Sequence, residues 1–514
     1  MAEGKYDKAI VFYEEASELQ PKAAVTYFHM GNAYRAKNRP DEAVICYQRA
    51  VHMQPGYAEA YNNMGLALQD KGDLIGSIPC FEKALESDPE LFQAYYNMGV
   101  SFMDRSHTDD AIFCFQKALL LKPDLSAAYN RLGSIFREQG RLDNAVFCFE
   151  KQLEIDPDDA QAYNNMGSVL HDRGEIEGAV ECFEQALRRD SDNPKIWWNC
   201  ALAQLLMGNL EEGWKKYEWR FKKPEWTSAH GQIDHLPRWD GRTFTGKRLL
   251  IRYEQGMGDV IQFIRYLPMV KTRGGTVIFE TEPSLARLLR GCRGIDELIL
   301  PLGETGDDGR FDLYLPLLSL PGVFGTTRET IPANVPYLHA EEKRIGLWRE
   351  RLHGVYGVKI GICWQGNPSY KGDRFRSIPL THFFGLATIK GVQLISLQKK
   401  YGVEQLRDLP QDISIIDLDP LLDVSTDAFV DTGAVMRNLD LVVTSDTAIA
   451  HLAGALGIQV WLLLQHVPEW RWGLTGEDCP WYPSMRLFRQ SRRGDWAGVF
   501  ERVCSKLRLF TSTR

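Results

Sequence analysis

Apolar residues in the first two hundred positions follow two periods at once. Within short segments they stand three and four residues apart, the spacing that places side chains on one face of an α-helix. The whole pattern then returns every 34 residues over five successive units. A unit of this length holds two helices, so we expect residues 1–225 to form a stack of helical hairpins.

Four columns define the repeated unit. The first helix carries a large aromatic residue and, four positions later, a glycine, whereas the second helix carries a small residue and then another aromatic residue. The columns are Tyr27, Tyr61, Tyr95, Tyr129, Tyr163 and Trp197; Gly31, Gly65, Gly99, Gly133 and Gly167; Ala43, Ser77, Ala111, Ala145 and Ala179; and Tyr47, Phe81, Phe115, Phe149 and Phe183. This pattern is typical of the tetratricopeptide repeat (TPR), and it predicts an α-solenoid of a half repeat, five full repeats and a degenerate one.

Three details qualify the repeat pattern. The chain begins with only the second helix of a unit, which indicates a truncated start or a capping helix. Pro79 falls inside a second helix, where we expect it to kink or break the helix. Equivalent positions of stacked helices lie roughly 10 Å apart, beyond disulfide reach, so the cysteines of one column are expected to be packing residues. These cysteines are Cys46, Cys80, Cys114, Cys148 and Cys182.

Asparagine recurs at the sixth position of the first helices, which line the concave side of such a stack. The residues are Asn63, Asn97, Asn165 and Asn199, and the column also contains His29 and Arg131. A side-chain amide donates and accepts hydrogen bonds at once, so a row of amides can hold an extended peptide backbone. The prediction is a groove for a protein or peptide partner, and the alternative is a solvated polar face.

After residue 225 the pattern changes. A segment rich in aromatic and turn residues at 226–247 reads as a linker. Short apolar runs then alternate with helical segments in two series, 248–340 and 341–514, which predicts two Rossmann-like lobes with parallel sheets. Ligands of such lobes bind beyond the carboxyl ends of the strands. The polar residues that follow the predicted strands are therefore the candidate site residues.

The richest strand end lies in the second lobe, at 442–457. A buried strand is expected to end at Ser445 and Asp446, and a helix to begin at Thr447. The free N–H groups and the dipole of that helix end suit a phosphate, and the Thr447 hydroxyl and the His451 imidazole can add donors. The alternative is an ordinary helix cap by Ser445 or Asp446.

A second polar loop follows the first strand of the same lobe, at 363–379. Lys371, Arg374 and Arg376 bring three positive charges to it, and Asn367 offers a neutral amide. In an acidic protein such a group suggests an anionic ligand, and a solvated surface loop is the alternative.

The first lobe has a glycine-rich turn between its first strand and first helix. The turn contains Gln255, Gly256 and Gly258, and Asp259 is expected to open the helix. It lacks the third glycine of the dinucleotide fingerprint. An aspartate at this position is either a helix cap or a functional carboxylate beside the strand end.

Two segments carry a resemblance to a known family. "GMGDVIQFIRYLP" in the first lobe and "SDTAIAHLAGALG" in the second resemble the lipopolysaccharide heptosyltransferases of glycosyltransferase family 9, which have the GT-B fold. Repeats ahead of such a region resemble the family 41 O-GlcNAc transferases, and the whole chain is similar to bacterial fusions of repeats with a glycosyltransferase.

The resemblance implies roles for individual residues. Asp259 corresponds to the base that deprotonates the acceptor hydroxyl, and Asp446, Thr447 and His451 correspond to residues that bind the donor diphosphate. The family usually has glycine where this chain has Ala448, which narrows the room for a phosphate. The turn at Gln255, Gly256 and Gly258 is then expected to place the acceptor.

The implied function is transfer of a sugar, UDP-GlcNAc being favoured, from a nucleotide-diphosphate sugar to a protein recruited by the repeats. The reaction is expected to be inverting and to need no metal or cofactor. Two alternatives stay open: a non-catalytic repeat scaffold with a degenerate nucleotide-sugar site, and a transferase acting on lipid or polysaccharide acceptors.

Composition limits the remaining classes. The formal net charge of −8 favours no nucleic-acid partner. The longest apolar run is about half the length that crosses a bilayer, and the N-terminus lacks the apolar core of a signal peptide. We therefore expect a cytoplasmic protein without a membrane span, and the exposed ends of the repeat stack make a homo-oligomer conceivable. The tryptophans Trp470, Trp472 and Trp481 are expected to pin the C-terminal helix or to wall the site.

Overall fold

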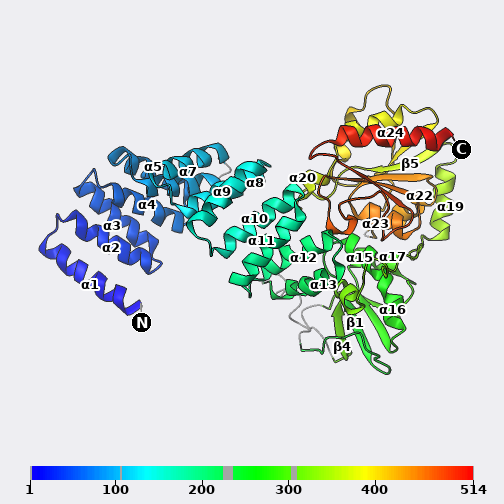
Figure 1. The fold of residues 1–514 in the computed structure, drawn as a ribbon, viewed down its shortest axis with the longest axis horizontal. Coiled ribbons are helices and arrows are strands. Elements are labelled where there is room, and N and C mark those ends of the chain that lie inside the picture. The colour runs from blue at the N-terminus through cyan, green and yellow to red at the C-terminus, as the bar shows by residue number, and fades with distance from the viewer. Residues whose placement is uncertain (1–2, 105–106, 224–234, 303–308, 426, 513–514) are drawn as a thin grey trace. The chain divides into compact units, whose positions relative to one another are not determined.

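The computed structural model describes residues 3–104, 107–223, 235–302, 309–425 and 427–512 (Figure 1). The chain forms two compact units. The first contains residues Met1–Asp172 with Gln185–Ser191, and the second contains Arg173–Glu184 with Asp192–Arg514. No helix within the described ranges is both long enough and apolar enough to cross a bilayer.

The first unit is built from paired helices. They are α1 (Glu3–Leu19), α2 (Ala24–Ala36), α3 (Pro40–Met53), α4 (Ala58–Asp70), α5 (Leu74–Ser87), α6 (Phe92–Asp104), α7 (Thr108–Leu121), α8 (Ser126–Glu138), α9 (Leu142–Ile155) and α10 (Ala160–Arg173), and α11 (Ile176–Arg189) spans the boundary between the units. Helices α2 and α3, α4 and α5, α6 and α7, and α8 and α9 pack against each other as hairpins. The predicted helical solenoid is confirmed.

Glycine and aromatic columns explain why these hairpins pack closely. A Cβ atom placed on Gly65 would lie 2.6 Å from the Phe81 ring, and one on Gly99 would lie 2.8 Å from the Phe115 ring. Both rings are fully buried. The glycine therefore makes room for the aromatic residue of the partner helix, and the same contact occurs between Gly31 and Tyr47 and between Gly133 and Phe149.

Two details of the repeats can be compared with expectation. Helix α5 runs through Pro79 without interruption, so the predicted break is wrong. Pro79 has no N–H, so the carbonyl of Ile75 lacks its usual hydrogen bond within the helix. Ile75 is 65% exposed, and water can therefore reach this carbonyl. The column cysteines are free thiols, four of them buried, and burial raises the pKa of Cys46 to about 11, as expected for packing residues.

The second unit begins with the last helices of the repeat region, α12 (Pro194–Leu206), α13 (Leu210–Tyr217) and the 3-10 turn η1 (Glu218–Lys222). The first part of the predicted linker, 226–234, lies outside the described residues. In its later part, Trp239 and Pro237 exchange backbone hydrogen bonds with Tyr314 at the edge of the first sheet.

Two parallel sheets follow. The first contains β1 (Arg248–Arg252), β2 (Thr276–Glu280), β3 (Glu297–Ile299) and β4 (Leu313–Pro316) in the order β3-β2-β1-β4. The second contains β5 (Val358–Cys363), β6 (Val392–Ser396), β7 (Ile415–Asp417), β8 (Leu441–Ser445), β9 (Val460–Leu464) and β10 (Met485–Arg489) in the order β10-β9-β8-β5-β6-β7. All their pairings are parallel, as predicted, although β10 was not expected.

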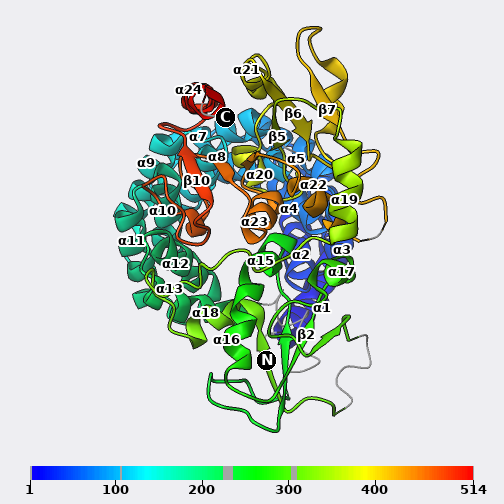
Figure 2. The same ribbon diagram turned by 90° about the vertical axis from the view of Figure 1, so that its right-hand side faces the viewer.

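Short helices connect the strands. They are α15 (Met257–Phe263), η2 (Ile264–Tyr266), α16 (Leu267–Lys271), η3 (Pro283–Leu285), α17 (Ala286–Leu289), η4 (Leu317–Ser319), α18 (Leu320–Val323), α19 (Glu342–Arg351), α20 (Asp373–Arg376), η5 (Leu380–Phe383), α21 (Phe384–Ala387), η6 (Val403–Asp408), α22 (Val430–Met436), α23 (Ala448–Ala455), η7 (Trp470–Trp472) and α24 (Trp496–Ser512). Figures 1 and 2 show α15 and α23 side by side between the two sheets, and these helices are in contact.

Strand order identifies where a ligand is expected. In the first sheet the order reverses between β1 and β4, and in the second between β5 and β8. Doubly wound sheets bind ligands beyond the carboxyl ends of the strands at such reversals. The three loops singled out from the sequence follow β1, β5 and β8, so all three lie at these points.

Candidate ligand-binding site

The loop after β1 leads directly into α15. The helix begins at Met257, with Gly256 as its N-cap residue, and Asp259 is its third residue. One carboxylate oxygen of Asp259 accepts the Gly256 N–H at 2.9 Å. Asp259 is therefore a helix cap in this structure, and the helix starts two residues before the position expected from the sequence.

The loop after β8 ends differently. Thr447 is the N-cap residue of α23, with an extended backbone, and it makes no side-chain capping hydrogen bond. Ser445 is fully buried, and its hydroxyl has no hydrogen-bond partner among the described residues. The expected alternative of an ordinary cap by Ser445 is therefore not what the structure shows. In the first turn of α23 the Ala450 N–H donates to the Thr447 carbonyl at 3.0 Å, and the Thr447 side chain caps none of the N–H groups.

The starts of α15 and α23 lie against each other. A Cβ atom placed on Gly258 would lie 3.0 Å from Cδ2 of His451 and 3.5 Å from Cα of Ala448. Glycine at position 258 allows this approach because a side chain would press on the imidazole ring. The structure thus brings together Asp259 of the first lobe and the Thr447 helix start of the second lobe. We call this junction the interlobe site.

Arg471 is the central cation of the interlobe site. Its guanidinium forms ion pairs with Asp259 and with Glu469, the latter at 2.5 Å, and its Nε donates to the side-chain oxygen of Gln262 at 2.5 Å. The Arg471 side chain is only 7% exposed. Arg471 was not among the predicted site residues, although the charged pair inside the tryptophan-rich run "PEWRWGL" was a usable signal.

Aromatic residues enclose this cation. Trp470 and Trp481 both pack on Phe263 of the first lobe. The centroid of the Phe263 ring lies 6.3 Å from that of Trp470 and 5.8 Å from that of Trp481. Trp472 stacks on His451 at 5.2 Å. Helix α24 packs instead on η5, α21 and β10. The expected role of pinning the C-terminal helix is therefore wrong, because two tryptophans bridge the lobes and the third covers the imidazole.

His451 is held as a neutral donor or acceptor. Burial, assisted by the charges of Arg471, Arg265 and Arg376, lowers the pKa of His451 well below its usual value. Its Nδ1 lies 3.0 Å from the Tyr482 hydroxyl. When that hydroxyl donates, the proton of the neutral ring is on Nε2, which is the nitrogen nearer to Gly258. His451 then offers an N–H donor at the interlobe site.

Asp446 carries an opposing preference. Burial raises the pKa of its carboxyl group, and the positive charges of Arg376 and Arg471 act against this shift. The Asp446 carboxylate therefore makes the start of α23 less favourable for an anion unless cations compensate it.

The loop after β5 contributes one of its three cations. Arg376 pairs with the buried Asp373 at 3.0 Å and acts electrostatically on Asp446. Lys371 and Arg374 are exposed, and Arg374 lies over the Phe375 ring. Asn367 is also exposed, and its oxygen accepts the N–H of Ser369 in the same loop. The structure thus draws Arg376 into the site and leaves the other three residues on the surface.

Unpartnered polar atoms cluster at the interlobe site. Ser445 Oγ and Gln262 Nε2 are buried and have no hydrogen-bond partner among the described residues. A buried polar group without a partner destabilises a protein by about 1–3 kcal/mol. A polar ligand or ordered water that reached these atoms would remove that penalty. In the part of the chain that the structure describes, no three His, Cys, Asp or Glu side chains are placed to hold a metal ion.

The last helices of the repeat region hold the loop after β1. Glu254 forms a two-pronged ion pair with Arg220, at 3.0 and 2.9 Å, and both side chains are completely buried. Gln255 has a left-handed backbone, with φ of 61°, and its amide donates to the Tyr217 hydroxyl at 2.6 Å. The turn that carries the candidate residues Gln255, Gly256 and Gly258 is thereby attached to α13 and η1.

The predicted peptide-holding asparagines are only partly connected. Asn97 donates to Asn62 at 2.9 Å, Asn62 donates to Asn63 at 3.0 Å, and Asn63 donates to Asn32 at 2.9 Å. This amide chain uses Asn32 and Asn62, which lie outside the column read from the sequence. Separately, Asn165 accepts from Gln161 within α10, and Asn199 lies on α12 in the second unit.

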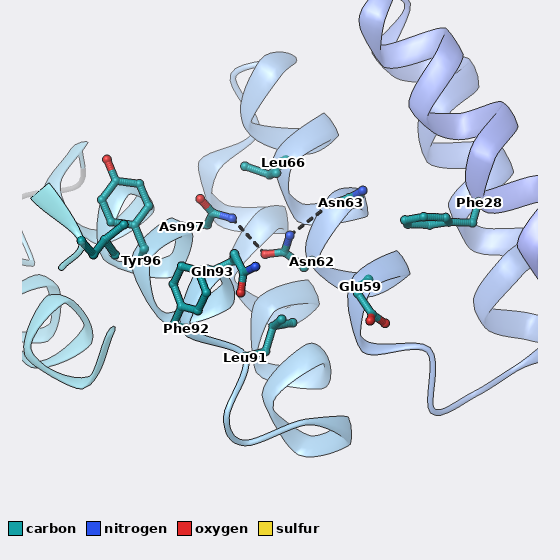
Figure 3. Close-up of a pocket in the computed structure, with 11 residues that line it drawn as sticks. Phe28, Glu59, Asn62, Asn63, Leu66, Leu91, Phe92, Gln93, Tyr96 and Asn97 are labelled. Carbon is teal, nitrogen blue, oxygen red and sulfur yellow. Dashed lines mark hydrogen bonds between the residues drawn. The ribbon is translucent and has the colours of Figure 1, made fainter. Parts of the chain in front are cut away.

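A pocket of about 430 Å³ opens beside the amide chain (Figure 3). Its walls come from α2, α4, α6 and the turn before α8. They comprise Phe28, Glu59, Asn62, Asn63, Leu66, Leu91, Phe92, Gln93, Tyr96, Asn97 and Leu125. The volume is within the range of small-ligand sites.

Comparison with known protein families supports the assignment of the front part of the chain to a repeat family. Residues 1–37, 31–72, 133–172 and 167–208 match a family described as TPR repeat. Residues 58–91 and 92–125 match families described as tetratricopeptide repeat. The front part of the chain therefore consists of tetratricopeptide repeats, as predicted.

One curated relative and several solved structures are similar. Protein FlbA of Caulobacter vibrioides (strain ATCC 19089 / CIP 103742 / CB 15) is 28% identical over an alignment of 333 residues, and the match covers 61% of this chain and 55% of FlbA. The chain thus spans about half the length of this relative. Because that share of the chain exceeds the residues matched as repeats, the similarity reaches into the lobes. MamA (26% identity, TM-score 0.30) covers 32% of this chain and 95% of its own. YrrB, titled a TPR protein with an unusual peptide-binding site (24%, 0.32), covers 36% and 95%.

Proposed function

We propose that this protein is a glycosyltransferase of the GT-B fold that moves a sugar from a nucleotide-diphosphate sugar to a protein held by its repeats. UDP-GlcNAc or a close analogue is the favoured donor. The observation that carries the proposal is the junction of α15 and α23 at the strand-order reversals of both sheets. The proposed setting is the cytoplasm.

The second lobe offers what a diphosphate leaving group needs. The start of α23 lacks a side-chain cap at Thr447, and the buried Ser445 hydroxyl is unpartnered. His451 supplies a neutral N–H, and Arg376 and Arg471 supply positive charge. Helix N-termini and fixed cations stabilise the negative charge that develops as the diphosphate leaves.

Asp259 is the proposed base. It takes the proton of the acceptor hydroxyl, the acceptor oxygen bonds to the anomeric carbon, and the bond from that carbon to the diphosphate oxygen breaks with its electron pair. A single displacement of this kind inverts the anomeric centre. Arg471 now holds the Asp259 carboxylate, and an anionic donor competes for the same guanidinium. Donor binding therefore frees the base only once the leaving group is in place.

Transfer of radiolabelled sugar tests the proposal directly. The wild type and Asp259→Asn are incubated with UDP-, ADP-, GDP- and CMP-sugars and with fractionated candidate proteins, and thermal shifts are recorded with each donor. We expect one donor to raise the melting temperature of both proteins, because a ligand that binds only the folded state stabilises it. We expect only the wild type to label a protein. Equal transfer by both forms would reject Asp259 as the base.

A second candidate function follows from the contacts of Asp259, whose carboxylate is already hydrogen-bonded and ion-paired within the protein. Its two oxygens serve a helix cap and an ion pair. This arrangement suits a non-catalytic scaffold that binds a nucleotide sugar without using it. Under this candidate the donor raises the melting temperature, but neither transfer nor donor hydrolysis occurs with any acceptor. A failure of every donor to shift the melting temperature would contradict both candidates.

A further inference from the structure

The apolar walls of the pocket in the first unit are a local departure from the repeat pattern. Phe28, Leu66 and Phe92 are partly exposed large residues on first helices. At the corresponding positions, other units carry mostly small or polar residues. The Phe28 column has Asn62, Asn130 and Asn164 but also Tyr96 and Trp198; the Leu66 column has Asn32, Ser134 and Ser168 but also Val100 and Leu202; and the Phe92 column has Ala58, Ser126 and Ala160. Phe28 and Leu66 pack in part on the buried cores of the repeats, and both also line the pocket together with Phe92. Exposed apolar surface in a pocket typically binds partners.

Beside these walls the amide chain is ordered for backbone recognition. Each bond from Asn97 to Asn62, Asn63 and Asn32 fixes the orientation of one amide, and the Tyr47 hydroxyl also donates to Asn32 at 2.7 Å. Each of these bonds uses one N–H of a donor amide that has two. Figure 3 shows Asn62, Asn63 and Asn97 grouped between the side chains of Phe28 and Tyr96. Prealigned amides reduce the ordering that an extended peptide must impose when it binds.

The two sides of the pocket differ in charge. Glu59 is the only formally charged residue of its lining, it is exposed, and it makes no ion pair with any described residue. Lys122 lies over the Phe92 ring, 4.9 Å from its centroid. Figure 3 shows Glu59 on the side of the pocket nearer to Phe28, and Phe92 on the opposite side. A cation of a bound partner is therefore favoured beside Glu59 and disfavoured beside Lys122.

We infer that this pocket binds an extended peptide in which an aromatic or leucine side chain is preceded or followed closely by lysine or arginine. The apolar side chain enters between Leu66 and Phe92, the basic side chain pairs with Glu59, and the amide chain holds the peptide backbone. The inference rests on the proposed function only in that the bound peptide is treated as part of the acceptor. Peptide binding itself needs no nucleotide sugar.

Fluorescence anisotropy with labelled 12-residue peptides tests this inference on the full chain. On a common Gly-Ser background, the peptides carry Lys-Gly-Phe, Lys-Gly-Leu, Lys-Gly-Ala or Glu-Gly-Phe, together with the reversed orders of each pair. We expect the Lys/Phe peptides to bind at least about tenfold more tightly than the Lys/Ala and Glu/Phe peptides. Phe92→Ala is expected to remove this advantage.

Two further variants keep the test decisive. Glu59 is exposed, so Glu59→Lys is expected to fold normally and to reverse the preference toward the Glu/Phe peptides. Phe113→Ala is the matched control, because Phe113 is 55% exposed on α7 and does not line the pocket. It is expected to leave binding unchanged. Equal affinity for all peptides, absence of binding up to about 1 mM, or an unchanged charge preference in Glu59→Lys would overturn the inference. Binding without sugar transfer would instead count against the proposed function alone.

Discussion

The guanidinium of Arg471 forms an ion pair with the carboxylate of Asp259, and this contact joins the second lobe to the first. Asp259 also caps α15 through the Gly256 N–H. Arg471 in turn pairs with Glu469 and lies over the Trp470 ring, 4.4 Å from its centroid. A single buried cation thus orders the start of one helix and the segment that follows β9 in the other lobe.

Replacing Arg471 with methionine is expected to destabilise the second unit strongly. The substitution keeps much of the packing on Trp470 but leaves Asp259 and Glu469 without their shared cation. Removing one member of a buried ion pair destabilises a protein by about 3–5 kcal/mol. The measurement is the urea midpoint of the transition followed by tryptophan fluorescence, since Trp470, Trp472 and Trp481 all lie at this site.

Arg486→Met is the control for that measurement. Arg486 pairs with Glu477, but both side chains are substantially exposed. Solvent weakens such a pair, so the urea midpoint is expected to change little. Equal shifts for the two variants would show that Arg471 does not organise the interlobe site.

Glu254→Gln is expected to loosen the turn that precedes α15. Glu254 and Arg220 are fully buried partners, and Glu254 also accepts the Leu318 N–H at 2.7 Å. The neutral amide removes the charge of Glu254 from the buried Arg220, whose ion pair with Glu218 remains. We expect hydrogen exchange at Gln255 and Gly256 to accelerate at least about tenfold, because local opening becomes easier. Glu297→Gln, at an exposed pair with Arg248 in the same lobe, should leave this exchange unchanged.

The sequence predicted the repeats and the loops well because both are local patterns. A column repeated every 34 residues identifies the helices, and polar residues directly after an apolar run identify a strand end. Gly258, Asp259, Ser445 and Thr447 were found in this way. Their meeting across the two lobes was expected from the family resemblance and not from spacing.

Long-range pairing was not readable from the sequence. Arg471 lies 212 positions from Asp259, and its place in a tryptophan-rich run does not tell which carboxylate it pairs with. Arg376 and Asp373 were visible as charges, but their pairing was not. The amide chain was missed because its bonds join positions 31 and 35 apart, three residues short of the 34-residue period and one residue beyond it. Strand β10 was not predicted because two of its five residues, Arg486 and Arg489, are charged and leave no continuous apolar run.

Gly99→Ala is expected to destabilise the first unit although alanine favours helices. The new Cβ would lie 2.8 Å from the buried Phe115 ring, and overpacking of this kind destabilises a protein by about 1–3 kcal/mol. The gain in helix propensity is only about 1 kcal/mol. Circular dichroism during thermal unfolding measures the result. Gly56→Ala in the same unit, where no atom lies within 4 Å of the new Cβ, should not lower the melting temperature.

His451 is expected to make stability depend on pH below about 6.5. The folded protein keeps the imidazole neutral, because burial and the charges of Arg471, Arg265 and Arg376 lower its pKa. The unfolded chain takes up a proton near pH 6.5, so it binds more protons than the folded chain as the pH falls. Stability therefore decreases with falling pH, by at most about 1.4 kcal/mol per pH unit.

The comparison with His451→Gln isolates this effect. Asp446 contributes with the opposite sign, because burial raises the pKa of its carboxyl group and protonation stabilises the folded state as the pH falls. Subtracting the profile of His451→Gln, measured as the free energy of unfolding between pH 5 and pH 8, removes most of that contribution. We expect the difference to be flat above pH 7 and to fall steadily below about pH 6.5. A difference that stays flat to pH 5 would mean that His451 is protonated in the folded protein, and it would then act as a cation toward a bound anion.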